Sequence, residues 1–118
     1  MAQPIPKILH TWSEDIPSGS ILHMRGELDL CSAPSFRTDL VQLIGRGRPV
    51  VVDFSELQFL DMRGIHVLED CNRLAEQRGQ RLVLVGSVPL VHKILTIAKV
   101  RERICVVDTV GEALKALG

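Results

Sequence analysis

The chain has 118 residues, of which 46% are hydrophobic, 24% charged and 3% aromatic. This length and balance are typical of one folded domain with a core of Val, Leu and Ile, and they exclude a disordered chain. Fourteen basic residues balance fourteen acidic ones, and this neutral total removes the main signal of a nucleic-acid-binding protein.

The N-terminal part of the chain predicts two strands that pair across a loose connection. Pro17 and Gly19 break the polar stretch between them, and Gly26 is expected to stop the second strand. The first strand is expected at about residues 7–12, the loop at 13–20 and the second strand at 21–25.

Beyond residue 26 the apolar pattern switches between helical spacing and short continuous runs, which predicts alternating helices and buried strands. Ser32 is the predicted N-cap of the first helix, and Thr109 with Glu112 forms a capping-box pattern at the last helix. Helices are expected within residues 33–44, 61–78, 87–98 and 109–117, and strands at 49–54, 81–85 and 104–107.

This order of elements predicts an α/β fold in a single domain over residues 1–118, with four helices and a mostly parallel or mixed sheet of about five strands. Residues 1–19 are expected to supply an N-terminal strand and loop, and residues 20–118 the body of the domain. Because the helices are few and the strands short, we expect one face of the sheet to be covered more fully than the other.

The chain lacks the sequence signatures of common enzymes and metal sites. It has no G-x-S-x-G elbow and no Walker A motif, and its four histidines have no metal-ligand spacing among themselves or with the cysteines. We therefore expect no catalysis, no metal and no cofactor. The histidines are His10, His23, His66 and His92.

Three widely spaced cysteines argue against a secreted disulfide framework. No apolar run approaches the roughly 20 residues that cross a bilayer, and residues 1–7 lack a basic-then-apolar export signal. We therefore expect a reduced, cytoplasmic protein with no membrane partner. Cys71 and Cys105 are predicted to be small core residues, with a redox disulfide between them as an alternative, and Cys31 lies in a loop.

The segment from Ser55 to Gly64, which is expected to be a loop, is the most informative part of the sequence for function. Asp61 stands where a carboxylate can cap a helix and favour the positive end of the helix dipole. Gly64, in the first turn, costs up to about 1 kcal/mol relative to alanine. It either clears the surface for a partner or packs closely against a neighbouring element. We expect a partner-binding corner at residues 61–64.

Three segments resemble the STAS domain family, which is typified by bacterial anti-sigma factor antagonists. Residues 26–29 and 32–34 read Gly-Glu-Leu-Asp and Ser-Ala-Pro, similar to the family's entry to its first helix. Residues 50–54 with 59–61 resemble its third strand and the turn beyond, and Gly64 matches the glycine that closes its Asp-Ser-(Ser/Thr)-Gly signature. The resemblance covers roughly residues 20–118.

The resemblance implies a non-enzymatic module that binds an anti-sigma factor with a histidine-kinase-like ATP-binding fold and so frees a sigma factor. In the typical antagonist, that kinase phosphorylates the serine after the aspartate and ends the complex. Met62 stands at the position of that serine and has no hydroxyl group, so the usual switch cannot operate there. The residues that we assign to partner binding are Asp61, Met62, Arg63, Gly64, Glu27 and Asp29.

Two hypotheses follow from this departure, and a third, of a different class, stands beside them. In the first, the protein is an antagonist that phosphorylation cannot switch off, regulated by abundance or redox state. In the second, it binds a different protein, with Met62 as an adaptable apolar contact and Arg63 as an anchor for a carboxylate or phosphate. In the third, a small ligand or nucleotide binds at one of the helix starts at Ser32, Asp61 or Ser87, where the helix dipole favours an anion.

Overall fold

The computed structural model describes residues 8–86 and 88–117, and within them five strands form a single mixed sheet. The strands follow one another across the sheet in sequence order; β1 and β2 are antiparallel, and all other neighbours are parallel. The predicted fold class is therefore confirmed. The elements are β1 (His10–Ile16), β2 (Gly19–Leu28), α1 (Ala33–Ile44), β3 (Val50–Leu60), α2 (Met62–Gln77), β4 (Leu82–Val85), α3 (Pro89–Ile97), the short 3-10 helix η1 (Val100–Glu102), β5 (Cys105–Val107) and α4 (Val110–Leu117).

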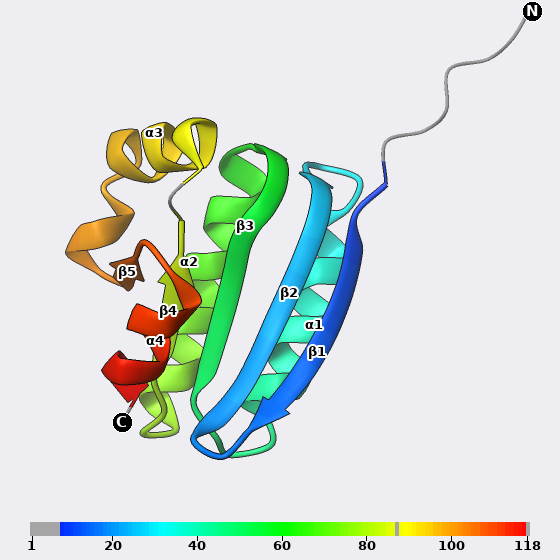
Figure 1. Ribbon diagram of the computed structural model, residues 1–118. Helices are drawn as coiled ribbons and strands as arrows, with labels where there is room; N and C mark the ends of the chain where they lie inside the picture. Colours follow the sequence, from blue (N-terminus) through cyan, green and yellow to red (C-terminus); the bar gives the residue numbers. More distant parts are fainter. Residues whose placement is uncertain (1–7, 87, 118) are drawn as a thin grey trace, which may run out of the picture.

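The direction of winding decides which face of the sheet each helix covers. Every parallel connection moves one strand further in the same direction, so right-handed crossovers place successive helices on the same face. Figure 1 shows α1 and α2 behind the sheet, α3 at its upper end and α4 in front of it beside β4. The rear face is therefore well covered, whereas the front face is left open over much of β1, β2 and β3. The expected unequal coverage is confirmed.

The two faces hold two separate cores. The larger core lies between the sheet and α1, α2 and α3, and its biggest fully buried side chains include Phe36 and Phe54. The smaller core packs Ala113 of α4 against the front of the sheet at Ile21 and Val51. Ile21 and its neighbour Leu22 serve opposite cores because successive side chains of a strand point to opposite faces.

Two strands extend further than the sequence predicts. β1 continues to Ile16 and forms a hairpin with β2, where a loop over residues 13–20 is expected. β3 continues to Leu60, opposite Leu28 of β2, where a loop from Ser55 onward is expected. Both extra stretches are mostly exposed because they lie at the sheet edge or beyond the reach of α4. The extra stretch of β1 is mostly polar, and in that of β3 the polar residues Ser55, Glu56 and Gln58 interrupt the apolar ones, so neither stretch forms the continuous apolar run that predicts a buried strand.

Gly26 does not end β2, contrary to the prediction. Its φ is +109°, and the register between β2 and β3 shifts directly after it. A Cβ atom at this position would lie 2.1 Å from the carbonyl oxygen of Ile8. The glycine therefore lets the strand bulge and pass close to another backbone, and β2 continues to Leu28.

The expected helices are present, but one predicted cap is wrong. Ser32 precedes α1 and makes no side-chain hydrogen bond to the helix start. The capping box of α4 is confirmed in its main feature, since Thr109 Oγ1 accepts a hydrogen bond from the Glu112 N–H at 3.1 Å. Ser87, expected at the start of α3, lies outside the described residues.

The cysteines divide between core and surface. Cys71 is buried as predicted, whereas Cys105 is exposed, because its strand β5 is a short edge strand. All three cysteines are free thiols. Of the helices in residues 8–86 and 88–117, none combines the length and the apolarity that a membrane crossing requires.

Candidate functional site

The predicted corner lies at the carboxyl ends of two adjacent parallel strands. Leu28 ends β2 and stands opposite Leu60, which ends β3. The N–H of Asp61 donates to the carbonyl oxygen of Leu28 at 3.2 Å, so the turn into α2 is tied to the end of β2. Sites in open α/β sheets gather at this end of the strands, because the loops after neighbouring strands meet there.

Asp61 is the N-cap of α2, as predicted. Its backbone is extended, and its Oδ1 accepts a hydrogen bond from the N–H of Arg63 at 2.9 Å. The carboxylate thus satisfies a backbone donor that the first turn leaves free. Because this negative group already occupies the start of α2, the geometry disfavours an anionic ligand at the same place.

Gly64 is buried and faces inward. A Cβ atom here would lie 2.7 Å from side-chain atoms of both Leu28 and Leu60. The glycine therefore allows α2 to pack closely on the ends of β2 and β3. Of the two roles that the sequence leaves open for Gly64, the structure supports close packing; Gly64 itself offers no exposed surface to a partner.

The loop after β2 is held by its own polar side chains. Asp29 Oδ1 accepts hydrogen bonds from the N–H groups of Cys31 and Ser32 at 2.9 and 3.1 Å. The Ser32 hydroxyl donates to the carbonyl oxygen of Glu27 at 2.8 Å. Ser32 therefore shapes this loop instead of capping α1, and the half-buried Asp29 has a structural task in addition to any contact with a partner.

The exposed part of the corner is apolar with one cation. Met62 is 49% exposed, and two further apolar side chains at the same end of the sheet, Leu30 and Phe59, are 58% and 39% exposed. Arg63 is exposed as well, and its guanidinium makes no ion pair among the described residues. Methionine, aromatic residues and arginine are favoured in protein interfaces.

A groove of about 600 Å³ lies between the first halves of α1 and α2, directly beside the corner. We call it the α1–α2 groove. Asp70 is its only lining acid, and this carboxylate is paired with Arg37 at 2.8 Å and also with Arg73. The hydrogen bond from Arg37 holds the pKa of Asp70 below its ordinary value. Residues on the groove wall are Leu30, Ala33, Pro34, Arg37, Thr38, Arg63, His66, Val67 and Asp70.

Because ion pairs with Arg37 and Arg73 offset the charge of Asp70, the α1–α2 groove is net positive. Arg63 supplies a charge with no ion-pair partner among the described residues, and His66 adds a titratable group on the same wall. Neither the groove nor the exposed Leu30 on its wall could be predicted from the sequence. Only the pairing of α1 with α2 brings their two walls together, and a single sequence carries no signal of that pairing.

The remaining predicted residues show no catalytic or metal-binding arrangement. Burial raises the pKa of the Cys71 thiol to about 11, so this cysteine is a poor nucleophile. In the part of the chain that the structure describes, no cluster of three or more His, Cys, Asp or Glu side chains could hold a metal ion.

The chain is similar to proteins of one family. The family model of the STAS domain matches residues 12–113, and no curated protein sequence matches the chain. An anti-sigma factor antagonist from Mycobacterium paratuberculosis is 23% identical, with a TM-score of 0.82 and coverage of 93% of this chain and 94% of its own.

Two further solved structures share this fold. The anti-sigma factor antagonist SpoIIAA of Bacillus, in its unphosphorylated form, is 21% identical with a TM-score of 0.76, over 92% of this chain and 96% of its own. RsbS of Moorella thermoacetica, with a serine-to-glutamate substitution, is 25% identical with a TM-score of 0.76, over 91% and 93% of the two chains.

Proposed function

This chain belongs to the STAS domain family, and on that premise we propose that it is a regulatory module that binds a protein partner and catalyses no reaction. The partner we propose is an anti-sigma factor with a histidine-kinase-like ATP-binding fold, whose capture frees a sigma factor. We place this complex in the cytoplasm, the compartment with which three free thiols are consistent.

The exposed corner beside the α1–α2 groove is the observation that carries the proposal. Met62 and Leu30 offer apolar contact, and Arg63, which has no ion-pair partner in the described part of the chain, offers a cation at the edge of a concave surface. An apolar centre with a charged anchor is the usual composition of a binding hot spot. We propose that a partner carboxylate pairs with Arg63 while apolar side chains of the partner cover Met62.

We further propose that phosphorylation at the family's usual position does not control this protein. A phosphate adds about −1.5 to −2 charges at a helix start that must pack against the partner, and so it breaks the complex. Met62 has no hydroxyl group that can receive a phosphate. The residue after Met62, Arg63, gives the corner a permanent positive charge.

Charge reversal at Arg63 tests the location of the interface. We expect Arg63→Glu to weaken binding to the cognate anti-sigma factor at least tenfold, the equivalent of about 1.4 kcal/mol. Its free energy of unfolding should stay within about 0.5 kcal/mol of the wild type, because the side chain is exposed and makes no ion pair with residues 8–86 or 88–117. The measurements are isothermal titration calorimetry and urea denaturation.

Lys115→Glu is the matched control, since it reverses one exposed charge on α4, at the far end of the molecule from the corner (Figure 1). It should leave the affinity unchanged. If Arg63→Glu binds as tightly as the wild type, this corner is not the interface. If no anti-sigma factor of the same cell binds the wild type, the partner class is wrong.

A further inference from the structure

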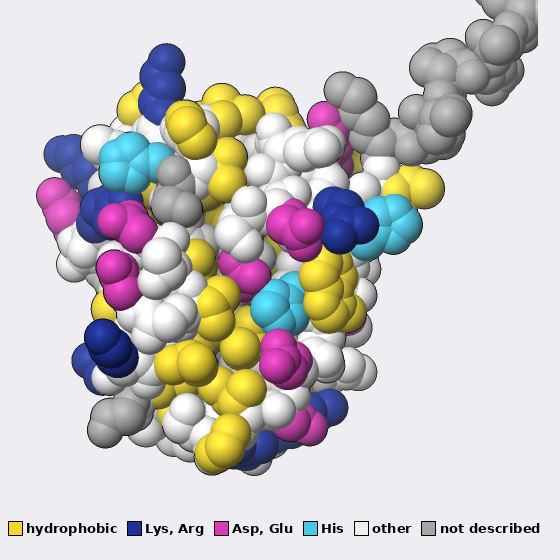
Figure 2. All heavy atoms as spheres, viewed as in Figure 1, with side chains coloured by type: hydrophobic (Ala, Val, Ile, Leu, Met, Phe, Trp, Pro, Cys, Tyr) yellow, Lys and Arg dark blue, Asp and Glu magenta, His cyan; other side chains and the backbone are white. Residues whose placement is uncertain are grey.

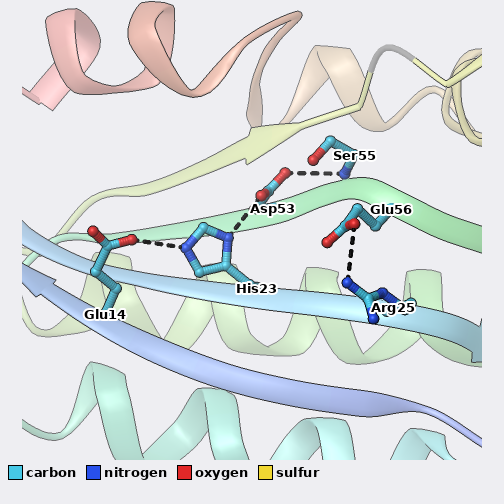
Figure 3. Close-up of polar contacts among 6 residues, drawn as sticks. All are labelled: Glu14, His23, Arg25, Asp53, Ser55 and Glu56. Carbon is cyan, nitrogen blue, oxygen red and sulfur yellow. Dashed lines mark hydrogen bonds and ion pairs between the residues drawn. The ribbon is translucent and has the colours of Figure 1, made fainter.

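The open front face of the sheet carries a histidine placed between two carboxylates. His23 lies on β2, and its Nδ1 is 2.8 Å from Oδ2 of Asp53 on β3. Its Nε2 is 3.0 Å from Oε1 of Glu14 on β1. Figure 3 shows the imidazole ring as the central link of a chain that crosses the three strands. This cluster lies on the sheet face opposite α1 and α2, away from the α1–α2 groove.

Among the described residues, the two charges that act on His23 are those of Glu14 and Asp53, and both lie on these strands. On β1, Trp12 stacks on the imidazole with ring centroids 5.4 Å apart and an interplanar angle of 19°. On β2, Arg25 lies over the Trp12 ring and pairs with Glu56 of β3 at 3.2 Å, so these two charges largely offset one another. Figure 2 shows acidic, basic and histidine side chains gathered over this part of the front face. Glu14 and Asp53 therefore dominate the local field.

Two carboxylate acceptors require two N–H donors on the ring. A neutral imidazole has one N–H and one lone pair, and only the imidazolium form donates from both nitrogens. We infer that His23 is held as an imidazolium clasp joining β1, β2 and β3, and that its deprotonation releases Glu14 and loosens the edge strand β1. Burial lowers the pKa of His23, but the hydrogen bonds and charges of Glu14 and Asp53 outweigh it and raise the pKa above 6.5.

The contact of His23 with Glu14 is the one that breaks, because the Glu14 carboxylate is exposed and the Asp53 carboxylate is buried. The Asp53 side chain is 8% exposed, and its other carboxylate oxygen accepts a hydrogen bond from the Ser55 N–H at 2.9 Å. The Glu14 side chain is 57% exposed and can turn into water at little cost. When the imidazolium loses one proton, the proton that remains on Nδ1 keeps its hydrogen bond to the buried Asp53 carboxylate. Nε2 then presents a lone pair to the Glu14 carboxylate, and the two repel each other.

Trp12 reports on this proton without any label, because it is the only tryptophan and the chain has no tyrosine. A stacked imidazolium quenches indole fluorescence by accepting an electron from the excited ring, whereas neutral imidazole does so poorly. We expect the fluorescence of the full chain to rise in a single step with increasing pH, at a midpoint above 6.5. The step should vanish in His23→Gln and persist in His92→Gln, a control on α3.

A midpoint at or below 6.5 in the wild type overturns the clasp, as does a step that survives in His23→Gln. A second measurement addresses the loosening of β1 and uses Glu14→Gln. A glutamine can both donate and accept, so it keeps a hydrogen bond to Nε2 in either protonation state of the ring.

We expect hydrogen-exchange protection factors of the β1 amides to fall about two- to fivefold across the midpoint in the wild type, the size of effect typical of an exposed ion pair. Glu14→Gln should show no such fall. Unchanged β1 protection in the wild type, or an equal fall in Glu14→Gln, contradicts the release of Glu14.

Discussion

The two faces of the sheet share the same strands but are stabilised by different interactions. The rear face is closed by α1 and α2 and is filled by aliphatic side chains and phenylalanine. On the front face, α4 covers one side only. The uncovered part carries the hydrogen-bonded side chains of Glu14, His23 and Asp53. The rear face stabilises the fold through burial, whereas the exposed front face is held by a few charged pairs. Their responses to mutation and to pH should therefore differ.

The largest difference is expected between two aromatic side chains on opposite faces. Phe36 of α1 is fully buried, so Phe36→Ala should lower the free energy of unfolding by about 3–5 kcal/mol. Trp12 on the front face is 42% exposed, so Trp12→Ala should cost about 1–2 kcal/mol. Urea denaturation of both variants measures these losses. Equal losses would show that the front face carries as much of the stability as the rear face.

A smaller effect is expected for two glycines in the first turns of helices on opposite faces. Alanine favours a helix by up to about 1 kcal/mol over glycine. At Gly111 in α4 the single described atom that a new Cβ meets within 4 Å is Thr109 Oγ1, at 3.8 Å, so Gly111→Ala should stabilise the protein. At Gly64 the new Cβ lies 2.7 Å from two buried leucines, so Gly64→Ala should destabilise it by about 1–2 kcal/mol. If Gly64→Ala instead stabilised the protein, α2 could move away from Leu28 and Leu60 at little cost, and the close packing inferred for Gly64 would be wrong.

The smallest effect is the dependence of stability on pH that the front face supplies. The folded-state pKa of His23 is raised above its ordinary value, so its contribution is complete below about pH 6.5 and is lost as the pH rises through the folded pKa. The difference in unfolding free energy between wild type and His23→Gln should fall by up to about 1 kcal/mol over that range. Urea denaturation at a series of pH values measures it. A constant or rising difference would contradict the assignment.

The same contrast explains which parts of the fold the sequence predicts. The strand at residues 81–85 and the helices carry apolar runs or stripes that match their burial, and these predictions are confirmed to within a few residues. The ends of β1 and β3 are not predicted because polar residues interrupt their apolar ones, and a partly exposed strand needs no continuous apolar run. The prediction that Gly26 ends β2 is wrong because glycine is equally typical of a β-bulge and of a strand end.

The candidate site was predictable only in part. The cap at Asp61 follows from local sequence alone and is confirmed. The inward packing of Gly64, the loop hydrogen bonds of Ser32 and the α1–α2 groove depend on contacts between distant segments, which a single sequence does not specify. The hydrogen bonds of His23 could not be predicted, because its partners Glu14 and Asp53 come from two other strands. The assignment of residues 61–64 to partner binding stays a prediction.

The most direct test of the proposed function is to measure binding to the cognate anti-sigma factor before and after incubation of the complex with ATP. The wild type should bind with unchanged affinity and gain no phosphate in its intact mass, because Met62 cannot be phosphorylated. Met62→Ser should gain one phosphate and lose binding, since it restores the hydroxyl group at the start of α2. A wild-type chain that is phosphorylated at another residue, such as Ser32 or Ser55, and then dissociates would contradict the account.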